Sequence, residues 1–292
     1  MHSSNWKLFK SMIRNPGSEA LSREMIGFTL EAPTAPVISQ DVIAYANATK
    51  DNSPAYKGNH APVPPFFLSK LMFPMIQEIC LHQNLRMNLL RMVHAEQEIL
   101  WHKPICVGDS PDVRFQIRDI YDTPAGEMIQ VSGKAYIEGE LAAEGISGFI
   151  IRSKSGQAKK KKKEEAAYPR HEQFRIEIQT DEGQQLKYAT ASGDHNFIHT
   201  NYLLAKMAGL PRTIMHGICV MAMTCSALAK QAVDGDVERL AGIRGRFAHP
   251  TLPGQKLTLV GYDSPHEGVI PFEVCNPFGK PVLKNGLFRF DE

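Results

Sequence analysis

A carboxylate and an imidazole, Asp194 and His199, lie close together in the segment Tyr188-Ala-Thr-Ala-Ser-Gly-Asp-His-Asn-Phe-Ile-His199. A second motif, Pro211-Arg-Thr-Ile-Met-His-Gly217, follows a short distance along the chain. An acid and an imidazole that share one water molecule suit proton transfer. A lone pair with this spacing is typical of a polar turn, so the order of the surrounding motifs decides the interpretation.

Two predicted helices must position this pair. The segment after His199 predicts a short helix, with Thr200 as N-cap and Gly209 as the stop signal. An apolar run from Ile218 to Val233 predicts a long buried helix that opens at Gly217. The N–H groups at a helix N-terminus carry partial positive charge, so the N–H of Gly217 is a candidate donor to a developing oxyanion.

The same side chains also form a candidate metal site. Asp194, His195, His199 and His216 are all residue types that bind metals, and His195 and His199 have a four-residue spacing. No cysteine is near enough in the sequence to complete such a site. The metal hypothesis therefore explains fewer positions than an acid–base site does, and it stays open as an alternative.

The order of these motifs resembles the MaoC-like, R-specific enoyl-CoA hydratase family. The family motif is Ser/Gly-Gly-Asp-x-Asn-Pro-x-His, followed by a small-residue helix, a proline and a His-Gly step. The matching positions are Ser192, Gly193, Asp194, Asn196, His199, Pro211, His216 and Gly217. Phe197 stands where the family usually has proline. This departure should alter loop stiffness more than chemistry, because proline contributes a fixed φ and no reacting group.

The resemblance implies a hot-dog fold, in which an antiparallel sheet wraps a long helix. It also implies that Asp194 and His199 are the catalytic dyad and that the N–H of Gly217 is the oxyanion donor. The site-supporting residues are Ser192, Gly193, Asn196 and His216. Asn196 is expected to fix the loop through bonds to neighbouring backbone groups. No metal and no organic cofactor are expected.

Two sequence echoes indicate an internal duplication. Tyr45-Ala-Asn-Ala-Thr-Lys-Asp51 resembles Tyr188-Ala-Thr-Ala-Ser-Gly-Asp194 at an offset of 143 residues. Trp101-His-Lys-Pro-Ile-Cys-Val-Gly108 resembles Phe247-Ala-His-Pro-Thr-Leu-Pro-Gly254 at an offset of 146 residues. Two echoes in the same order at nearly equal offsets favour a repeated unit. A helix followed by strands, given twice, predicts an α+β protein of two hot-dog domains packed as a pseudo-dimer.

The first of these domains is predicted to be degenerate. Aligning Asp51 with Asp194 puts Tyr56 opposite His199, and Val63-Pro-Pro-Phe66 replaces the His-Gly step. A tyrosine does not take up a proton near neutral pH as an imidazole does. We expect this half to supply packing and room for an acyl chain.

The predicted boundaries are 1–152 for the degenerate domain, 153–169 for a linker and 170–292 for the catalytic domain. The apolar segment Pro65–Ile79 of the first domain predicts a helix that is kinked or interrupted at Pro74. The linker contains five consecutive lysines, Lys159–Lys163, which are typical of a solvated charge block. An electrostatic attraction for a carrier protein or CoA phosphates is the functional alternative for that run.

Composition narrows the class of protein. With 292 residues, 43% hydrophobic and 22% charged residues and a net charge of +2, the chain has ordinary globular values. This charge gives no reason to expect nucleic acid or a membrane surface as a partner. The five cysteines lack paired spacing, which favours reduced thiols and a cytoplasmic location. We find no secretory signal pattern and no run long enough to span a membrane.

The function predicted from the resemblance is reversible hydration of trans-2-enoyl thioesters and dehydration of (3R)-hydroxyacyl thioesters. Asp194 and His199 would activate water, and the carrier of the substrate would be CoA or acyl carrier protein. The resemblance also allows a homodimer of double hot dogs. Two other functions stay open: a hot-dog acyl thioesterase, and a non-catalytic protein that binds acyl thioesters.

Overall fold

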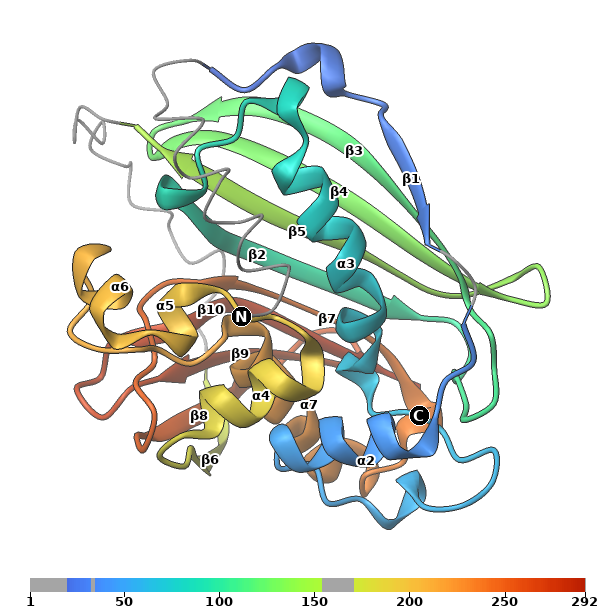
Figure 1. Ribbon diagram of the computed structural model, residues 1–292. Coiled ribbons are helices and arrows are strands. Elements are labelled where there is room, and N and C mark those ends of the chain that lie inside the picture. Colours follow the sequence, from blue (N-terminus) through green and yellow to red (C-terminus); the bar gives the residue numbers. More distant parts are fainter. Residues whose placement is uncertain (1–19, 33–34, 154–170, 292) are drawn as a thin grey trace.

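A single antiparallel sheet forms the centre of the computed structural model, which describes residues 20–32, 35–153 and 171–291 (Figure 1). The lysine run and nearly all of the predicted linker lie outside the described residues. Within the described part, the sheet has ten strands, and their spatial order is β1 (Thr29–Ala32), β3 (Asp112–Thr123), β4 (Gly126–Ile137), β5 (Glu140–Arg152), β2 (Met92–Trp101), β7 (Leu240–Phe247), β10 (Pro281–Phe290), β9 (Val269–Cys275), β8 (Lys256–Tyr262) and β6 (Glu172–Gln179).

The strand order repeats. The first half runs β1-β3-β4-β5-β2, and the second half, taken from its own edge, runs β6-β8-β9-β10-β7. The halves meet where β2 pairs with β7, from Glu96↔Arg246 to Leu100↔Gly242. The predicted double hot-dog fold is therefore confirmed, with the two halves joined into one sheet through their inner edge strands, β2 and β7.

One long helix packs on each half of this sheet. Helix α3 (Leu68–Leu81) packs on β1 and β3, and helix α7 (Gly217–Val233) packs on β6, β7 and β10. In Figure 1, α3 crosses the face of the first half, drawn in green. The remaining α-helices of the described residues are α2 (Ser39–Ala48), α4 (Gln184–Ser192), α5 (Phe197–Thr200) and α6 (Tyr202–Met207), and six short 3-10 helices join them.

Sequence spacing explains both long helices. In α3, Leu68, Met72, Met75 and Ile79 recur at helical spacing and are buried. Helix α3 continues through Pro74, which lies on its exposed side. The sequence predicted a kink or an interruption at this proline, and the interruption is not observed. An exposed position leaves the carbonyl that loses its partner accessible to water.

Helix α7 is buried on almost all sides, as a helix enclosed by a sheet must be. Its internal polar groups therefore need local partners. Thr224 lies within it, and its Oγ1 donates a hydrogen bond to the carbonyl of Val220 at 2.8 Å. The prediction of a helix from Ile218 to Val233 is confirmed.

The loop helices differ from the sequence expectation. The single short helix predicted after His199 is two helices, α5 and α6, and Thr200 is the last residue of α5 instead of an N-cap. Asn201 caps α6, because its Oδ1 accepts a hydrogen bond from the N–H of Leu204 at 3.1 Å.

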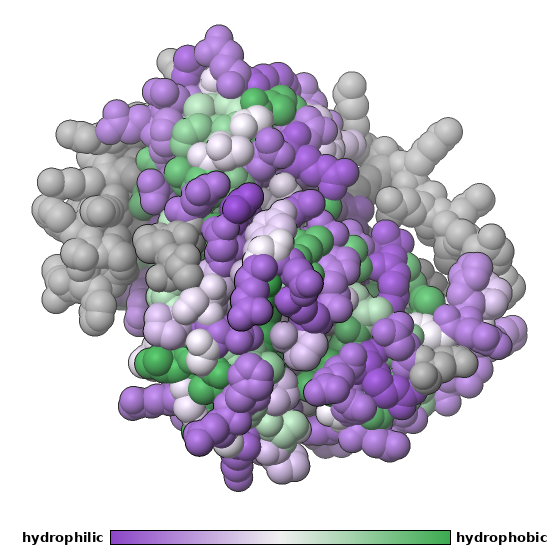
Figure 2. Space-filling view, turned by 90° about the vertical axis from the view of Figure 1, so that its right-hand side faces the viewer, coloured by the Kyte–Doolittle hydropathy of each residue, from purple (hydrophilic) through white to green (hydrophobic). Residues whose placement is uncertain are grey.

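On the face shown in Figure 2, polar residues predominate and apolar residues gather only in small patches. The large apolar side chains lie between the helices and the sheet, where they form one core cluster. All five cysteines are free thiols. Among the described residues, no helix combines the length and the apolar character needed to cross a membrane.

Candidate active site

Asp194 follows directly from the end of α4. Ser192 closes the helix: its Oγ donates to the carbonyl of Tyr188 at 2.8 Å and accepts the N–H of Asp194 at 3.2 Å. Gly193 then adopts φ of 83°, a left-handed conformation that glycine adopts without a steric cost. These two residues turn the chain sharply, so that Asp194 leaves the helix end at a fixed angle.

Asn196 holds the next turn. Its N–H donates to Asp194 Oδ1 at 3.1 Å, and its own Oδ1 accepts the N–H of Ile198 at 3.3 Å. It is the N-cap of α5, the short helix that carries His199. The side chains of Asp194 and Asn196 therefore fix the short segment that separates the carboxylate from the imidazole.

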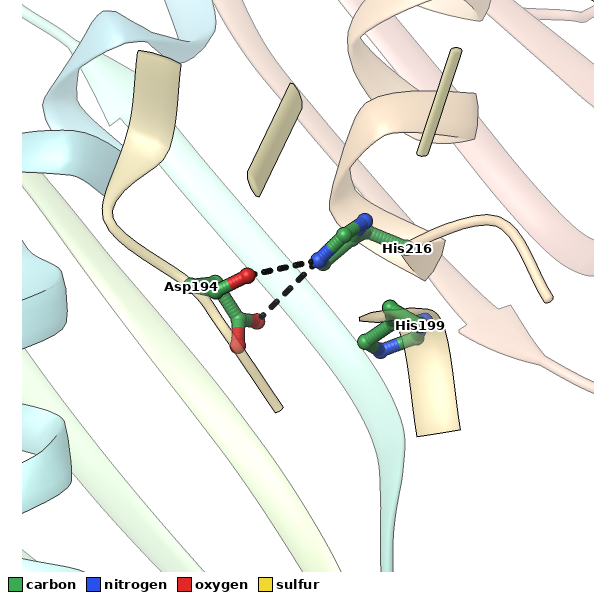
Figure 3. Close-up of side chains that lie close together, drawn as sticks. All are labelled: Asp194, His199 and His216. Atoms are coloured by element: carbon green, nitrogen blue, oxygen red, sulfur yellow. Dashed lines mark hydrogen bonds and ion pairs between the residues drawn. The ribbon is translucent and has the colours of Figure 1, made fainter. Parts of the chain in front are cut away.

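His199 lies on a second histidine. The rings of His199 and His216 are stacked, with centroids 3.7 Å apart and an interplanar angle of 25° (Figure 3). The ring of Tyr188 also packs against the ring of His216, with 4.8 Å between the centroids. His216 is the N-cap residue of α7, and its Nε2 lies 2.9 Å from the carbonyl oxygen of Asp194. This stack connects α4, α5 and α7.

Hydrogen bonds define the proton positions in the two rings. Nδ1 of His199 lies 2.9 Å from the carbonyl oxygen of Ile214. A carbonyl only accepts, so Nδ1 carries the proton and Nε2 of the neutral ring keeps its lone pair. By the same argument, Nε2 of His216 carries the proton that bonds Asp194. His199 is thus arranged to accept a proton through Nε2.

Burial sets the charge states of the site. Desolvation raises the pKa of Asp194 above its usual value, and the nearby His199 partly opposes that shift. Desolvation lowers the pKa of His199, against the raising effect of the Asp194 charge. The pKa of His216 is lowered well below the usual value, mainly by burial. Both imidazoles are therefore neutral at neutral pH, and His199 is available as a base.

A metal fits these residues less well. Asp194, His199 and His216 each place one ligand atom within 4.8 Å of the others, while His195, the fourth candidate, is outside this group. The lone pairs of an imidazole lie in the ring plane. In stacked rings the lone pairs of the two rings lie in two separate, nearly parallel planes, which is unfavourable for convergence on one ion. The arrangement favours proton transfer over metal binding.

Gly217 begins α7 beside this pair. A Cβ added at Gly217 would lie 2.8 Å from Cε1 of Phe247, so only glycine fits without displacing that ring. Among the hydrogen bonds of the described residues, none uses the N–H of Gly217. As the first N–H of the helix it has no partner within the helix, and it is free to bind an anionic oxygen.

Asp194, His199 and Gly217 line one large cavity of about 690 Å³. His216 and Phe247 line the same cavity. The opposite wall comes from the first half, where α3 contributes Ser69, Met72, Phe73, Ile76, Gln77, Cys80 and Leu81. The cavity is therefore formed between the halves, and neither half encloses it alone.

The equivalent position in the first half is closed. Tyr56 donates a hydrogen bond from its hydroxyl to Asp51 Oδ2 at 2.7 Å, and both residues are buried. Neither lines the large cavity. A smaller pocket of about 160 Å³ lies near Trp101, which donates from Nε1 to the carbonyl of Pro65 at 3.1 Å.

The structure adds Tyr188, to which the sequence analysis gave no role. Its hydroxyl lies 3.2 Å from that of Tyr45, the matching residue of the first echo, and 3.4 Å from Oγ of Ser69. The repeated Tyr-Ala-x-Ala pattern was the available signal, because equivalent residues of a pseudo-dimer meet near its axis.

Comparisons with known proteins agree with this architecture. Residues 163–263 match the family described as MaoC like domain, and residues 24–144 match the FAS1-like, dehydratase domain region. The chain is 28% identical to 3-hydroxyacyl-thioester dehydratase Y of Mycobacterium tuberculosis, over 70% of this chain and 74% of that protein. It is 26% identical to the peroxisomal enoyl-CoA hydratase 2 of Arabidopsis thaliana, over 57% of this chain and 58% of that protein.

A solved structure extends the likeness to nearly the whole fold. The crystal structure of a MaoC-like dehydratase from Phytophthora capsici superposes with a TM-score of 0.81 at 25% identity, covering 93% of this chain and 98% of that one. The fold is that of double hot-dog proteins, and the relatives named as dehydratases and hydratases indicate a hydro-lyase. The chain thus carries a MaoC-like domain in its second half and matches a FAS1-like dehydratase region in its first.

Proposed function

We propose that this protein hydrates trans-2-enoyl thioesters and, in reverse, dehydrates (3R)-hydroxyacyl thioesters. The observation that carries the proposal is the convergence of Asp194, His199 and the Gly217 N–H on one cavity. The relatives named as a 3-hydroxyacyl-thioester dehydratase and an enoyl-CoA hydratase support the substrate class. The cavity wall from α3 offers apolar surface to an acyl chain.

The catalytic step needs a base, an acid and a stabilised oxyanion. Nε2 of neutral His199, together with the Asp194 carboxylate, holds one water and removes its proton as its oxygen attacks the β-carbon. The pair then returns a proton to the α-carbon. Negative charge builds on the thioester oxygen during the attack. The Gly217 N–H, at the positive end of α7, donates a hydrogen bond to this oxygen.

The environment of Asp194 also suits the reverse reaction, dehydration, in which the proton moves in the opposite direction. Its carboxylate accepts the N–H of Asn196 at one oxygen and remains accessible from the cavity, since 26% of the side chain is exposed. An ionised Asp194 stabilises His199 after His199 takes the proton, because opposite charges attract strongly in a site of low polarity. The same two groups serve dehydration in the opposite direction.

The test is an assay of purified full-length protein with crotonyl, octenoyl and hexadecenoyl thioesters. Loss of absorbance at the enoyl thioester band without release of thiol is the expected result. Thiol release from saturated acyl thioesters would identify a thioesterase instead. Binding without either change would identify an acyl-binding protein. The same series, run with CoA and with acyl carrier protein as carriers, would establish which carrier is used.

A further inference from the structure

The wall of the large cavity contains unpaired polar atoms that the catalytic site does not explain. Within the described residues, Nη2 of Arg91 and Nε2 of His94 are buried and have no hydrogen-bond partner, and both residues line the cavity. A buried polar atom without a partner typically costs about 1–3 kcal/mol. Such atoms in a cavity wall indicate groups of a ligand that would bind them.

His94 is held as a neutral acceptor. Its ring lies 4.6 Å from that of Phe149 and 4.7 Å from that of Phe247, measured between centroids. Burial lowers the pKa of His94 to about 4, although hydrogen bonds to the Glu96 backbone and to Gln97 oppose the shift. A neutral imidazole has one nitrogen that can accept a hydrogen bond, and Nε2 of His94 is buried without a partner.

This acceptor lies close to the reacting centre. Phe247, which contacts the ring of His94, is also the residue that a Cβ at Gly217 would strike. Gln97 is fixed in turn by Ser147, whose Oγ donates to Gln97 Oε1 at 2.7 Å. Only one aromatic ring therefore separates His94 from the expected place of the thioester.

Arg91 lies beside a second arginine. Met92 pairs with Ile151, so that Arg91 and Arg152 lie at neighbouring ends of β2 and β5, and both line the cavity. Arg152 is exposed. Among the described residues, no carboxylate pairs with either guanidinium. Two like charges on neighbouring strands repel each other unless an anion lies between them.

The matching positions of the second half show that this polar wall is specific to the working cavity. At the offset of 146 residues, Arg91 and His94 correspond to Val237 and Leu240. Those two residues line the smaller pocket. At these two positions the repeat therefore carries polar side chains in the half that lines the cavity containing Asp194 and His199, and apolar side chains in the other half.

An amphiphilic ligand fits this division of the cavity. The α3 wall is mainly apolar, while the wall from β2 and β5 adds the polar side chains of His94, Gln97, Ser147 and exposed Arg152 to apolar ones. Resting on the proposed function, we propose that Arg91, Arg152 and His94 form a subsite for the phosphopantetheine arm of the thioester. The arginines bind its phosphate, and Nε2 of His94 accepts the N–H of the amide nearer to the sulfur. The first half would then recognise the carrier as well as the acyl chain.

Carriers of increasing length test the subsite on the full-length protein. One enoyl chain is attached to ethanethiol, to N-acetylcysteamine, to pantetheine and to CoA, which add first the amides and then the phosphate. Arg91→Gln is expected to raise KM about tenfold for the CoA thioester alone, with kcat unchanged. His94→Phe keeps the ring contacts and is expected to raise KM for every carrier except ethanethiol. Arg118→Gln, an exposed arginine on β3, is the matched control and should change nothing.

Two results would overturn the subsite. One is an Arg91→Gln protein whose KM for the CoA thioester is unchanged, or is raised equally for all four carriers. The other is an effect of Arg91→Gln that appears only when the acyl chain ends in a carboxylate, which would assign the arginines to the tail of the substrate.

Binding of free CoA, measured by calorimetry, separates this proposal from the proposed function. Weaker CoA binding by Arg91→Gln would support the subsite even if the wild-type protein hydrated no thioester. Equal CoA binding by wild type and variant would overturn it.

Discussion

The ring of His216 stacks on the ring of His199, with 3.7 Å between the centroids. Nε2 of the same His216 ring donates a hydrogen bond to the backbone carbonyl of Asp194. One histidine therefore contacts both members of the proposed dyad without occupying the Nε2 face of His199. Because His216 also precedes the first residue of α7, the same contact ties the dyad to the N–H of Gly217. This single side chain therefore contacts the proposed base and acid and adjoins the proposed oxyanion donor.

Replacing either member of the dyad should abolish most of the activity. Asp194→Asn and His199→Ala are each expected to lower the hydration rate by at least about 10², the usual contribution of a positioned acid or base. The double variant should be little worse than either single one, because both groups act on one water. Steady-state kinetics measure the effect, and circular dichroism checks the fold. Near-full activity in either single variant would refute the assignment.

A methyl group at Gly217 should be enough to disturb the oxyanion donor. In Gly217→Ala the new Cβ meets the ring of Phe247 at 2.8 Å, so the helix start or the ring must move. Loss of one such donor typically lowers kcat by about 10² to 10³. Adding Phe247→Leu relieves the collision and should restore part of kcat. A Gly217→Ala protein with normal kcat at saturating substrate would argue against an oxyanion role.

The pH dependence of kcat/KM should show an unusually acidic lower limb. His199 must be neutral to act as a base, and its pKa lies below the usual 6.5, while that of Asp194 lies above the usual 3.8. Activity is therefore expected to stay level as the pH falls through 6.5 and to decrease between these two values. A limb centred above 6.5 would contradict the burial of His199.

The charge of Asp194 raises the pKa of His199, which gives an independent check. Asp194→Asn removes that charge, so the pKa of His199 should fall further. A titration of the His199 ring by NMR measures the shift and needs no catalysis. A rise in this pKa would show that the two side chains do not interact as the structure places them.

His94 should make folding stability depend on pH. Its pKa of about 4 is below the usual 6.5, so the unfolded chain binds this proton more readily than the folded chain. The stabilisation is present above pH 6.5 and is lost as the pH falls towards 4, by about 2 kcal/mol between pH 7 and pH 5. Urea unfolding at these two pH values measures it. His94→Phe should remove this part of the loss, whereas His171→Phe, at an exposed histidine, should not.

The buried pair in the first half should matter for stability and not for catalysis. Tyr56→Phe removes the hydrogen bond to Asp51 and leaves a buried carboxylate without that partner, which typically costs about 1–3 kcal/mol. Hydration of short enoyl thioesters should be unchanged, because neither residue lines the cavity. Thermal unfolding and kinetics on the same protein separate the two effects. A loss of half the activity would indicate a second working site.

The sequence predicted the double fold because its strongest signals are local. Helix α7 is a long apolar run between glycine and aspartate, and the duplicated motifs occur in the same order in both halves. Strand β2 was not predicted, since His94, Glu96 and Glu98 interrupt its apolar pattern. Those glutamates pair with arginines of the second half, Arg246 and Arg289, so their place in a strand depends on contacts between halves.

The site was predicted only in part, because one of its walls also depends on contacts between the halves. The motif identified the residues that α4, α5 and α7 bring together, because their spacing is local. Helix α4 was not predicted, since its low apolar content gives a weak helical pattern. Arg91 and His94 carry no local motif, and only their comparison with Val237 and Leu240 at the repeat offset distinguishes them. A sequence motif therefore does not predict the cavity wall that the first half supplies.

The closed pair of Asp51 and Tyr56 has a consequence for how such a chain can diverge. In a symmetric dimer of single hot dogs, each substitution appears at both sites, so a change that improves one wall also alters the catalytic centre of the other. Fusion of the two units removes that constraint. With the position equivalent to the proposed dyad closed by a 2.7 Å hydrogen bond, the first half can acquire arginines, a histidine or a proline-containing helix without changing the residues around Asp194 and His199. Differences in substrate preference among related fused chains should therefore accumulate in the first half, while the residues around Asp194 and His199 stay fixed.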